Sequence, residues 1–121
     1  MQTPVKIIAT DDDADIRQLI ELSLQREGYE VGSVASGELL LNRLKSVTPD
    51  ILLLDIMMPG MSGYDVCRAM RQEASLKNVM IVAQTGWGQE EHRKRSEEAG
   101  FNHHLVKPVH LETIEAILGT V

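Results

Sequence analysis

The sequence predicts a single α/β domain of three layers, in which helices cover both faces of a parallel five-stranded sheet. Short apolar runs alternate with segments of helical period along all 121 residues, which is typical of repeated strand and helix units. Three of the runs (KIIA, ILLL and VMIVA) are apolar almost throughout, as expected for strands that are covered on both sides. With 43% hydrophobic and 25% charged residues, residues 1–121 are expected to form one domain with its own core.

Each strand is expected where a short apolar run is bounded by polar or turn-forming residues. The expected strands, in order, are Val5 to Ala9, Glu30 to Val34, Ile51 to Leu54, Val79 to Ala83 and His104 to Val106.

Apolar residues spaced three or four apart predict the helices between these strands. The four apolar stripes are Ile16, Leu19, Ile20 and Leu24, which Gly28 ends; Leu40, Leu41, Leu44 and Val47; Val66, Ala69 and Met70; and Leu111, Ile114 and Leu118. A further helix, fourth in chain order, is expected over Gln89 to Ala99. Charge pairs such as Glu90 with Lys94 support it in place of apolar residues.

Composition restricts the partners and the cellular setting. Eighteen acidic residues against twelve basic ones give a net charge of -6, which disfavours direct binding to nucleic acid phosphates. Cys67 is the single cysteine, and no long apolar segment resembles a signal peptide or a membrane span. We therefore expect a reduced, cytoplasmic protein that contacts neither nucleic acid nor a membrane.

Reactive side chains follow four of the five expected strands. Asp11 and Asp12 follow the first strand, Asp55 the third, Thr85 the fourth and Lys107 the fifth. In an open parallel sheet, ligands bind outside the carboxyl ends of the strands. The sequence therefore predicts that these five side chains converge on one edge of the sheet.

The predicted cluster suits phosphoryl chemistry. Three crowded carboxylates need a cation, and oxygen ligands favour Mg²⁺ or Mn²⁺. A carboxylate beside a metal ion, a lysine and a hydroxyl can act as a nucleophile toward phosphorus. The neighbouring Asp13 and Asp15 are expected to face the first turn of the following helix, where the helix dipole favours negative charge.

Four motifs occur together in a fixed order along the chain. They are the aspartates after the first strand, the loop DIMMPGMSG at 55–63, Thr85 followed by Gly86, and the pair Lys107 and Pro108. In this order and spacing they resemble the receiver domains of two-component response regulators, whose loop reads D-x-x-M-P-x-x-x-G. The resemblance covers the whole chain and implies a flavodoxin-like fold with strand order 2-1-3-4-5.

The later stretch TGWGQEEHRKRSEEAGFNHHLVKPV is most similar to receivers attached to hybrid histidine kinases. It lacks the Asp-Asp-Tyr and Lys-Pro-Phe pattern of receivers that dimerise to bind DNA. We therefore do not expect this receiver to act by dimerising on DNA. The sequence does not identify its output.

The resemblance implies a role for each residue of the cluster. Asp55 would accept a phosphoryl group from the phosphohistidine of a histidine kinase or a histidine phosphotransfer protein. Asp11 and Asp12 would hold Mg²⁺, or Mn²⁺, together with a carboxylate oxygen of Asp55 and the backbone carbonyl of Met57. Such a domain takes part in its own phosphorylation without being a conventional turnover enzyme.

The same resemblance implies how phosphorylation is reported. Lys107 would pair with the acyl phosphate, and Thr85 would bind a phosphoryl oxygen. His104 occupies the switch position that usually carries Tyr or Phe. Thr85 and His104 would relay the change to a surface made by the fourth helix, the fifth strand and the fifth helix, where an unknown output partner binds. Met57 and Trp87 stand at the positions that tune loss of phosphate, and both predict slow self-dephosphorylation.

Two other functions remain open on sequence alone. The DDDAD segment can be compared with the first motif of haloacid dehalogenase-like aspartyl-phosphate phosphatases, although the chain is short and lacks a late acidic pair. A receiver-shaped interaction module that is not phosphorylated is the other. Thr10 and Gln84 are polar where the receiver family usually has an apolar residue, and the sequence assigns neither a role.

Overall fold

Five parallel strands form one sheet in the order β2-β1-β3-β4-β5, which confirms the predicted fold class and strand order. This computed structural model describes residues 5–58, 60–85, 98–106 and 111–118. The strands are β1 (Lys6–Thr10), β2 (Glu30–Val34), β3 (Ile51–Asp55), β4 (Met80–Thr85) and β5 (His103–Val106). Every residue of β3 is buried, as the apolar run ILLL predicts for a central strand.

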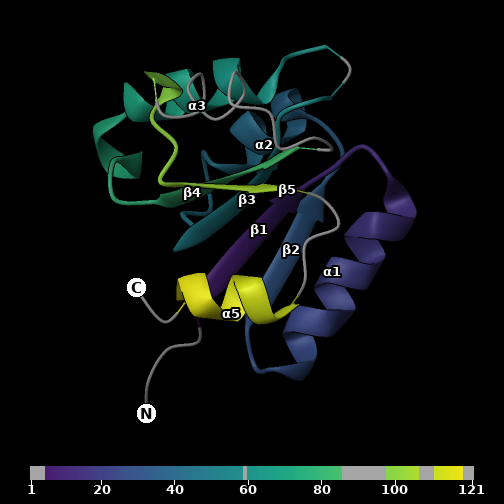
Figure 1. The fold of residues 1–121 in the computed structure, drawn as a ribbon. Helices are drawn as coiled ribbons and strands as arrows, with labels where there is room; N and C mark the ends of the chain where they lie inside the picture. The colour runs from purple at the N-terminus through teal and green to yellow at the C-terminus, as the bar shows by residue number, and fades with distance from the viewer. Residues whose placement is uncertain (1–4, 59, 86–97, 107–110, 119–121) are drawn as a thin grey trace.

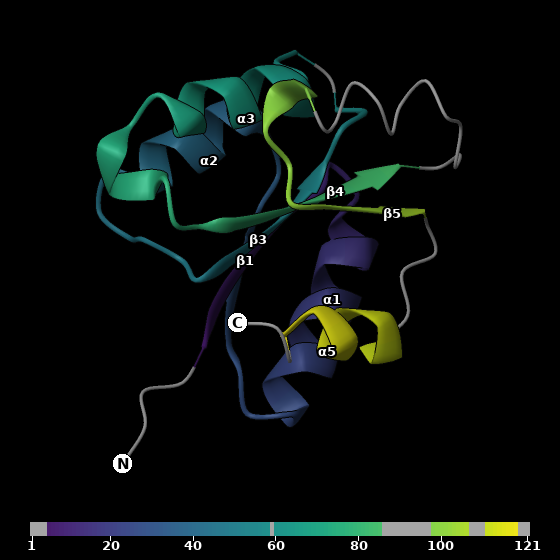
Figure 2. The same cartoon turned by 60° about the vertical axis from the view of Figure 1, so that its left-hand side comes forward.

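Helices cover both faces of the sheet (Figures 1 and 2). They are α1 (Ala14–Arg26), α2 (Gly37–Arg43), α3 (Gly63–Arg71) and α5 (Leu111–Leu118), with a short 3-10 helix at Ala74–Leu76 that the sequence did not predict. Helices α2 and α3 lie on one face, and α1 and α5 on the other. The expected fourth helix lies outside the described residues except at its end, where 98 and 99 are helical. Among the described helices, none is both long and apolar enough to cross a bilayer.

The sheet divides the apolar interior into two clusters. The α2/α3 cluster joins Ile8, Leu52 and Ile81 of the sheet to helix residues such as Leu40 and Met70. The α1/α5 cluster lies against the opposite face and contains Ile7, Ala9, Ile51, Leu53 and Val82 of the sheet, with Leu24, Ile114 and Ile117 of the helices. Successive strand residues alternate between the two clusters because side chains on a strand alternate between faces.

One predicted core position in α1 is wrong. Leu24 is fully buried and Ile20 packs against the α1/α5 cluster, but the side chain of Leu19 is 66% exposed. Each residue of an α-helix turns about 100°, so Leu19 points about 140° away from Leu24. The helix buries one stripe of residues, and Leu19 lies outside that stripe.

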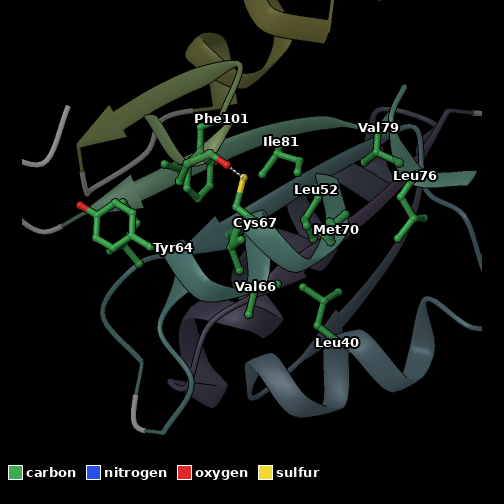
Figure 3. Packing of buried hydrophobic residues seen from close by; sticks show 14 of the residues in the cluster. Leu40, Leu52, Tyr64, Val66, Cys67, Met70, Leu76, Val79, Ile81 and Phe101 are labelled. Atoms are coloured by element: carbon green, nitrogen blue, oxygen red, sulfur yellow. Dashed lines mark hydrogen bonds between the residues drawn. The ribbon is translucent and has the colours of Figure 1, made fainter. Parts of the chain in front are cut away.

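Helix α3 holds the segment that leads into β5. Figure 3 shows the thiol of Cys67 pointing to the carbonyl oxygen of Ala99, to which it donates a hydrogen bond at 3.3 Å. Burial raises the pKa of this thiol to about 11, so it keeps the proton that it donates. The rings of Tyr64 and Phe101 meet edge to face, with centroids 6.4 Å apart. Contacts from α3 therefore fix residues 99–101.

Arg71, the last residue of α3, makes the most extensive of these contacts. Its Nε donates to the carbonyl oxygen of Gly100 at 2.9 Å, and its Nη2 donates to Oδ1 of Asn102 at 2.7 Å. Nη1 donates to the carbonyl oxygens of Lys77 and Val79, at 3.1 and 3.0 Å. One side chain thus joins α3, the start of β4 and the start of β5.

We expect Arg71→Leu to lower the free energy of unfolding by about 2 to 4 kcal/mol, because four hydrogen bonds contribute about 1 kcal/mol each. Urea denaturation measures the change. Arg68→Leu is the matched control, since exposed Arg68 makes a surface ion pair with Asp65 at 3.3 Å, whose loss should cost under about 1 kcal/mol. Equal losses in the two variants would contradict a special role for Arg71.

Candidate functional site

Three carboxylates gather at the carboxyl edge of the sheet. Asp55 is the last residue of β3, and Asp11 and Asp12 directly follow β1, the neighbouring strand. The β1–β3 register pairs Thr10 with Leu54, so the next residues on the two strands, Asp11 and Asp55, are level with each other. One carboxylate oxygen from each aspartate lies within 4.8 Å of the other two. The structure therefore brings these three predicted residues together.

Burial makes this cluster electrostatically costly. Asp11 is 1% exposed and Asp55 3%, whereas Asp12 is exposed. Two negative charges 4 Å apart repel by about 4 kcal/mol at the dielectric typical of a protein surface. A divalent cation would offset this repulsion, and a set of oxygen donors is what Mg²⁺ and Mn²⁺ prefer. The cluster is an acidic pocket that could bind a metal ion.

Backbone amides orient the two buried carboxylates. Oδ1 of Asp11 accepts a hydrogen bond from the backbone N–H of Asp13 at 2.9 Å, and Oδ1 of Asp55 accepts one from that of Met57 at 3.0 Å. Both bonds close tight turns directly after a strand. The chain thereby holds each carboxylate in one orientation, as a site for a directional ligand requires.

The acidic run at residues 11–13 divides as predicted. Asp13 is the N-cap of α1, and its Oδ1 accepts hydrogen bonds from the backbone N–H groups of Asp15 and Ile16, at 2.9 and 3.3 Å. Asp15 lies in the first turn, where the helix dipole favours a negative charge. Asp13 therefore belongs to the helix start, and Asp11 and Asp12 belong to the cluster with Asp55.

Gly63 closes the loop that follows Asp55. Its backbone N–H donates to the carbonyl oxygen of Ile56 at 3.1 Å. A Cβ at this position would stand 2.8 Å from the carbonyl oxygen of Asp55 and 2.7 Å from the Cα of Ile56, both backbone atoms. A side chain would force α3 away from the end of β3, so glycine lets the helix begin directly against the site.

The remaining predicted site residues are placed only in part. Thr85 is the last residue of β4, one residue beyond Gln84, which pairs with Asp55; the side chain of Thr85 is outside the described set. His104 is half-buried on β5, and Met57 is 68% exposed beside Asp55. Lys107 and Trp87 lie outside the described residues. The roles of these five residues stay predictions.

Two features of the site were missed or left unexplained. Arg17 of α1 donates from Nη1 to the carbonyl oxygen of Asp11 at 2.7 Å, which brings a positive charge to the acidic edge. The sequence signal for this contact is weak: Arg17 simply follows the acidic run, in the first turns of the helix. Thr10 and Gln84, each 1% exposed, carry buried polar atoms (Oγ1 and Nε2) without a hydrogen-bond partner among the described residues.

The fold and the site define a class: a doubly wound parallel α/β domain with an acidic cluster at the carboxyl edge of its central strands. The family described as "Response regulator receiver domain" matches residues 7–119. The chain therefore belongs to the receiver domains of response regulators. This membership confirms the predicted family and favours neither the phosphatase nor the unphosphorylated module.

Known proteins agree with this assignment. The chain is 36% identical over 103 residues to the transcriptional regulatory protein ResD of Bacillus subtilis, matching 85% of this chain and 42% of ResD. The chemotaxis protein CheY4 of Vibrio cholerae has a similar structure, with a TM-score of 0.92, 31% identity and coverage of 98% of this chain and 99% of that one.

The signal receiver domain of a signal transduction histidine kinase from Syntrophus aciditrophicus has the same fold, with a TM-score of 0.87. The superposition covers 96% of this chain and 88% of that one. At 22% identity that likeness shows the fold alone. The chain spans less than half the length of the curated relatives it matches, such as 42% of ResD and 46% of a probable transcriptional regulator from Guillardia theta.

The division of the acidic run predicts opposite effects for neighbouring substitutions. We expect Asp12→Asn to weaken Mg²⁺ binding by at least about ten-fold, the size of effect that even outer partners of metal ligands have, without loss of stability. Asp13→Ala should cost about 1 kcal/mol of stability through the lost cap and change Mg²⁺ affinity by no more than about two-fold. Isothermal titration calorimetry and thermal unfolding measure the two quantities. Loss of Mg²⁺ binding in Asp13→Ala would contradict the division.

Proposed function

We propose that this receiver domain is a phosphorylation-dependent switch in which Asp55 accepts the phosphoryl group. The observation that carries the proposal is the meeting of Asp11, Asp12 and Asp55, with oxygens within 4.8 Å, at the carboxyl edge of the sheet. Asp55 is the member that the N–H of Met57 orients and that stands at the end of the central strand. Its place at the end of the central strand, beside Asp11 and Asp12, supports Asp55 as the acceptor.

The donor is the phosphohistidine of a histidine kinase or a histidine phosphotransfer protein. A carboxylate oxygen of Asp55 forms a bond to phosphorus while the bond from phosphorus to the imidazole nitrogen breaks, and the electron pair of that bond stays with the imidazole. Bound Mg²⁺, or Mn²⁺, supplies positive charge against the carboxylates and the phosphoryl oxygens. Asp11, Asp12, Asp55 and the backbone carbonyl of Met57 would hold it.

The response continues through residues near the edge of the sheet. Lys107 pairs with the acyl phosphate, and Thr85 binds a phosphoryl oxygen. Thr85 and His104 then carry the change to the face of the fourth helix, β5 and α5, where the output partner binds. The net charge of -6 supports a protein partner over direct contact with nucleic acid. The single, unpaired Cys67 supports a cytoplasmic setting.

Asp55→Asn should abolish phosphorylation, because an amide cannot act as the nucleophile. The protein is incubated with Mg²⁺ and acetyl phosphate, and intact-mass spectrometry detects the adduct. Asp65→Asn is the matched control, since Asp65 is an exposed aspartate on α3, and it should be phosphorylated like the wild type. An adduct that persists in Asp55→Asn would refute the assignment, and rapid release of phosphate that depends on Asp11 would indicate a phosphatase.

The wild type is expected to lose its phosphoryl group slowly. Met57 presents an exposed thioether beside Asp55, which cannot orient an attacking water by strong hydrogen bonds. Met57→Asn and Trp87→Glu add groups that can, so both should shorten the lifetime of the acyl phosphate several-fold. Decay of a radiolabelled phosphoryl group gives the rates, with Met57→Leu as an apolar control. Equal lifetimes in all four proteins would contradict this role.

A further inference from the structure

Gln84 is the neighbour of Asp55 on the next strand of the sheet. The β3–β4 register pairs Asp55 with Gln84, and the N–H of Ile56 donates to the carbonyl oxygen of Gln84 at 3.0 Å. Residues paired in register on adjacent parallel strands point to the same face, about 4.8 Å apart. The side chains of Asp55 and Gln84 therefore start side by side.

The α1/α5 cluster identifies the face that they share. Leu53 and Val82, two residues before Asp55 and Gln84, both belong to it, and strand side chains two apart point the same way. Ala9, two residues before Asp11, belongs to it as well. Across β1, β3 and β4 the row thus reads Asp11, Asp55, Gln84. Gln84 flanks the proposed acceptor on the side away from Asp11.

The side-chain amide of Gln84 is a buried hydrogen-bond donor that lacks an acceptor among the described residues. Its side chain is 1% exposed, and Nε2 has no hydrogen-bond partner among the described residues. An amide –NH₂ carries two donors and cannot accept, so the missing partner is a hydrogen-bond acceptor, such as an oxygen atom. Buried donors in native proteins are almost always satisfied, and one that is not points to a ligand. The neighbouring Asp55 is where a phosphoryl group would bring new oxygens.

We propose that Gln84 is a positioning residue of the receiver site, which donates from Nε2 to an oxygen of the phosphoryl group on Asp55. This inference rests on the proposed role of Asp55. The contact forms only when the phosphoryl group is present, so it stabilises the phosphorylated form without adding to metal binding. Gln84 thereby acts on the side of the acceptor opposite the carboxylates of Asp11 and Asp12.

Thr10 provides a control of the same kind on the other face of the sheet. It is equally buried, and its Oγ1 also lacks a partner among the described residues. Ile8, two residues before it, belongs to the α2/α3 cluster, so Thr10 points away from the row that contains Asp55. Thr10→Val therefore shows what the removal of a buried, unpaired polar atom does when that atom does not face the site.

The experiment measures the affinity for beryllofluoride, an analogue of the phosphoryl group, at saturating Mg²⁺ in the wild type and four variants, one of which is Asp55→Asn. We expect Gln84→Met to bind it about ten-fold more weakly, the effect of one lost hydrogen bond to a charged group. Gln84→Glu, which replaces the donor with an anionic acceptor, should bind more weakly still. Thr10→Val should differ from the wild type by no more than about two-fold. The affinity for Mg²⁺ alone should be the same in the wild type, Gln84→Met and Thr10→Val.

Thermal unfolding without ligands establishes that Gln84→Met is folded, and its midpoint should equal or exceed that of the wild type because a buried unsatisfied donor has been removed. Unchanged beryllofluoride affinity in Gln84→Met, with binding abolished in Asp55→Asn, overturns the role of Gln84 and leaves the proposed function intact. Equal weakening in Thr10→Val, or of Mg²⁺ binding in Gln84→Met, also overturns it. Failure of the wild type to bind, or binding by Asp55→Asn, overturns the proposed function and this inference with it.

Discussion

The hydrogen-bonded register of β1, β3 and β4 is the constraint on which the site depends. It brings the residues after β1 level with Asp55 at the end of β3, and Asp55 level with Gln84 on β4. A slip of one residue in β3 would turn Asp55 to the opposite face and separate it from Asp11. The register is strongly specified because β3 is apolar and buried on both faces, so the core that stabilises the domain also aligns its reactive groups.

This alignment places function and stability in opposition. Two buried carboxylates and a third nearby repel one another. Backbone N–H groups that donate to Oδ1 of Asp11 and Asp55, and the guanidinium of Arg17 on the carbonyl of Asp11, oppose this repulsion. A ligand that binds only the folded state stabilises it by mass action. A cation bound at the cluster would therefore strengthen the fold as well as complete the site.

The sequence predicted most of the fold because its signals were local and mutually consistent. Apolar runs located the five strands to within one or two residues, and strand-end aspartates located the acidic cluster. It misplaced Leu19, since spacing alone cannot say how wide a stripe the helix buries. It gave no role to Arg17 or Gln84. Arg17 contacts a backbone carbonyl, that of Asp11, and the position of Gln84 beside Asp55 becomes apparent only from the register. The roles of Thr85 and Lys107 stay predictions, because their side chains lie outside the described residues.

The contacts of Arg71 fix the start of β5 through bonds to residues 100 and 102. Arg71 binds the carbonyl of Gly100 and the side chain of Asn102, and Asn102 in turn exchanges two hydrogen bonds with the backbone of Ile81. These bonds, the thiol of Cys67 and the β4–β5 ladder do not involve residues 86–97. The start of β5 is therefore tied both to α3 and to β4, so that its place at the edge of the sheet does not depend on its own ladder alone.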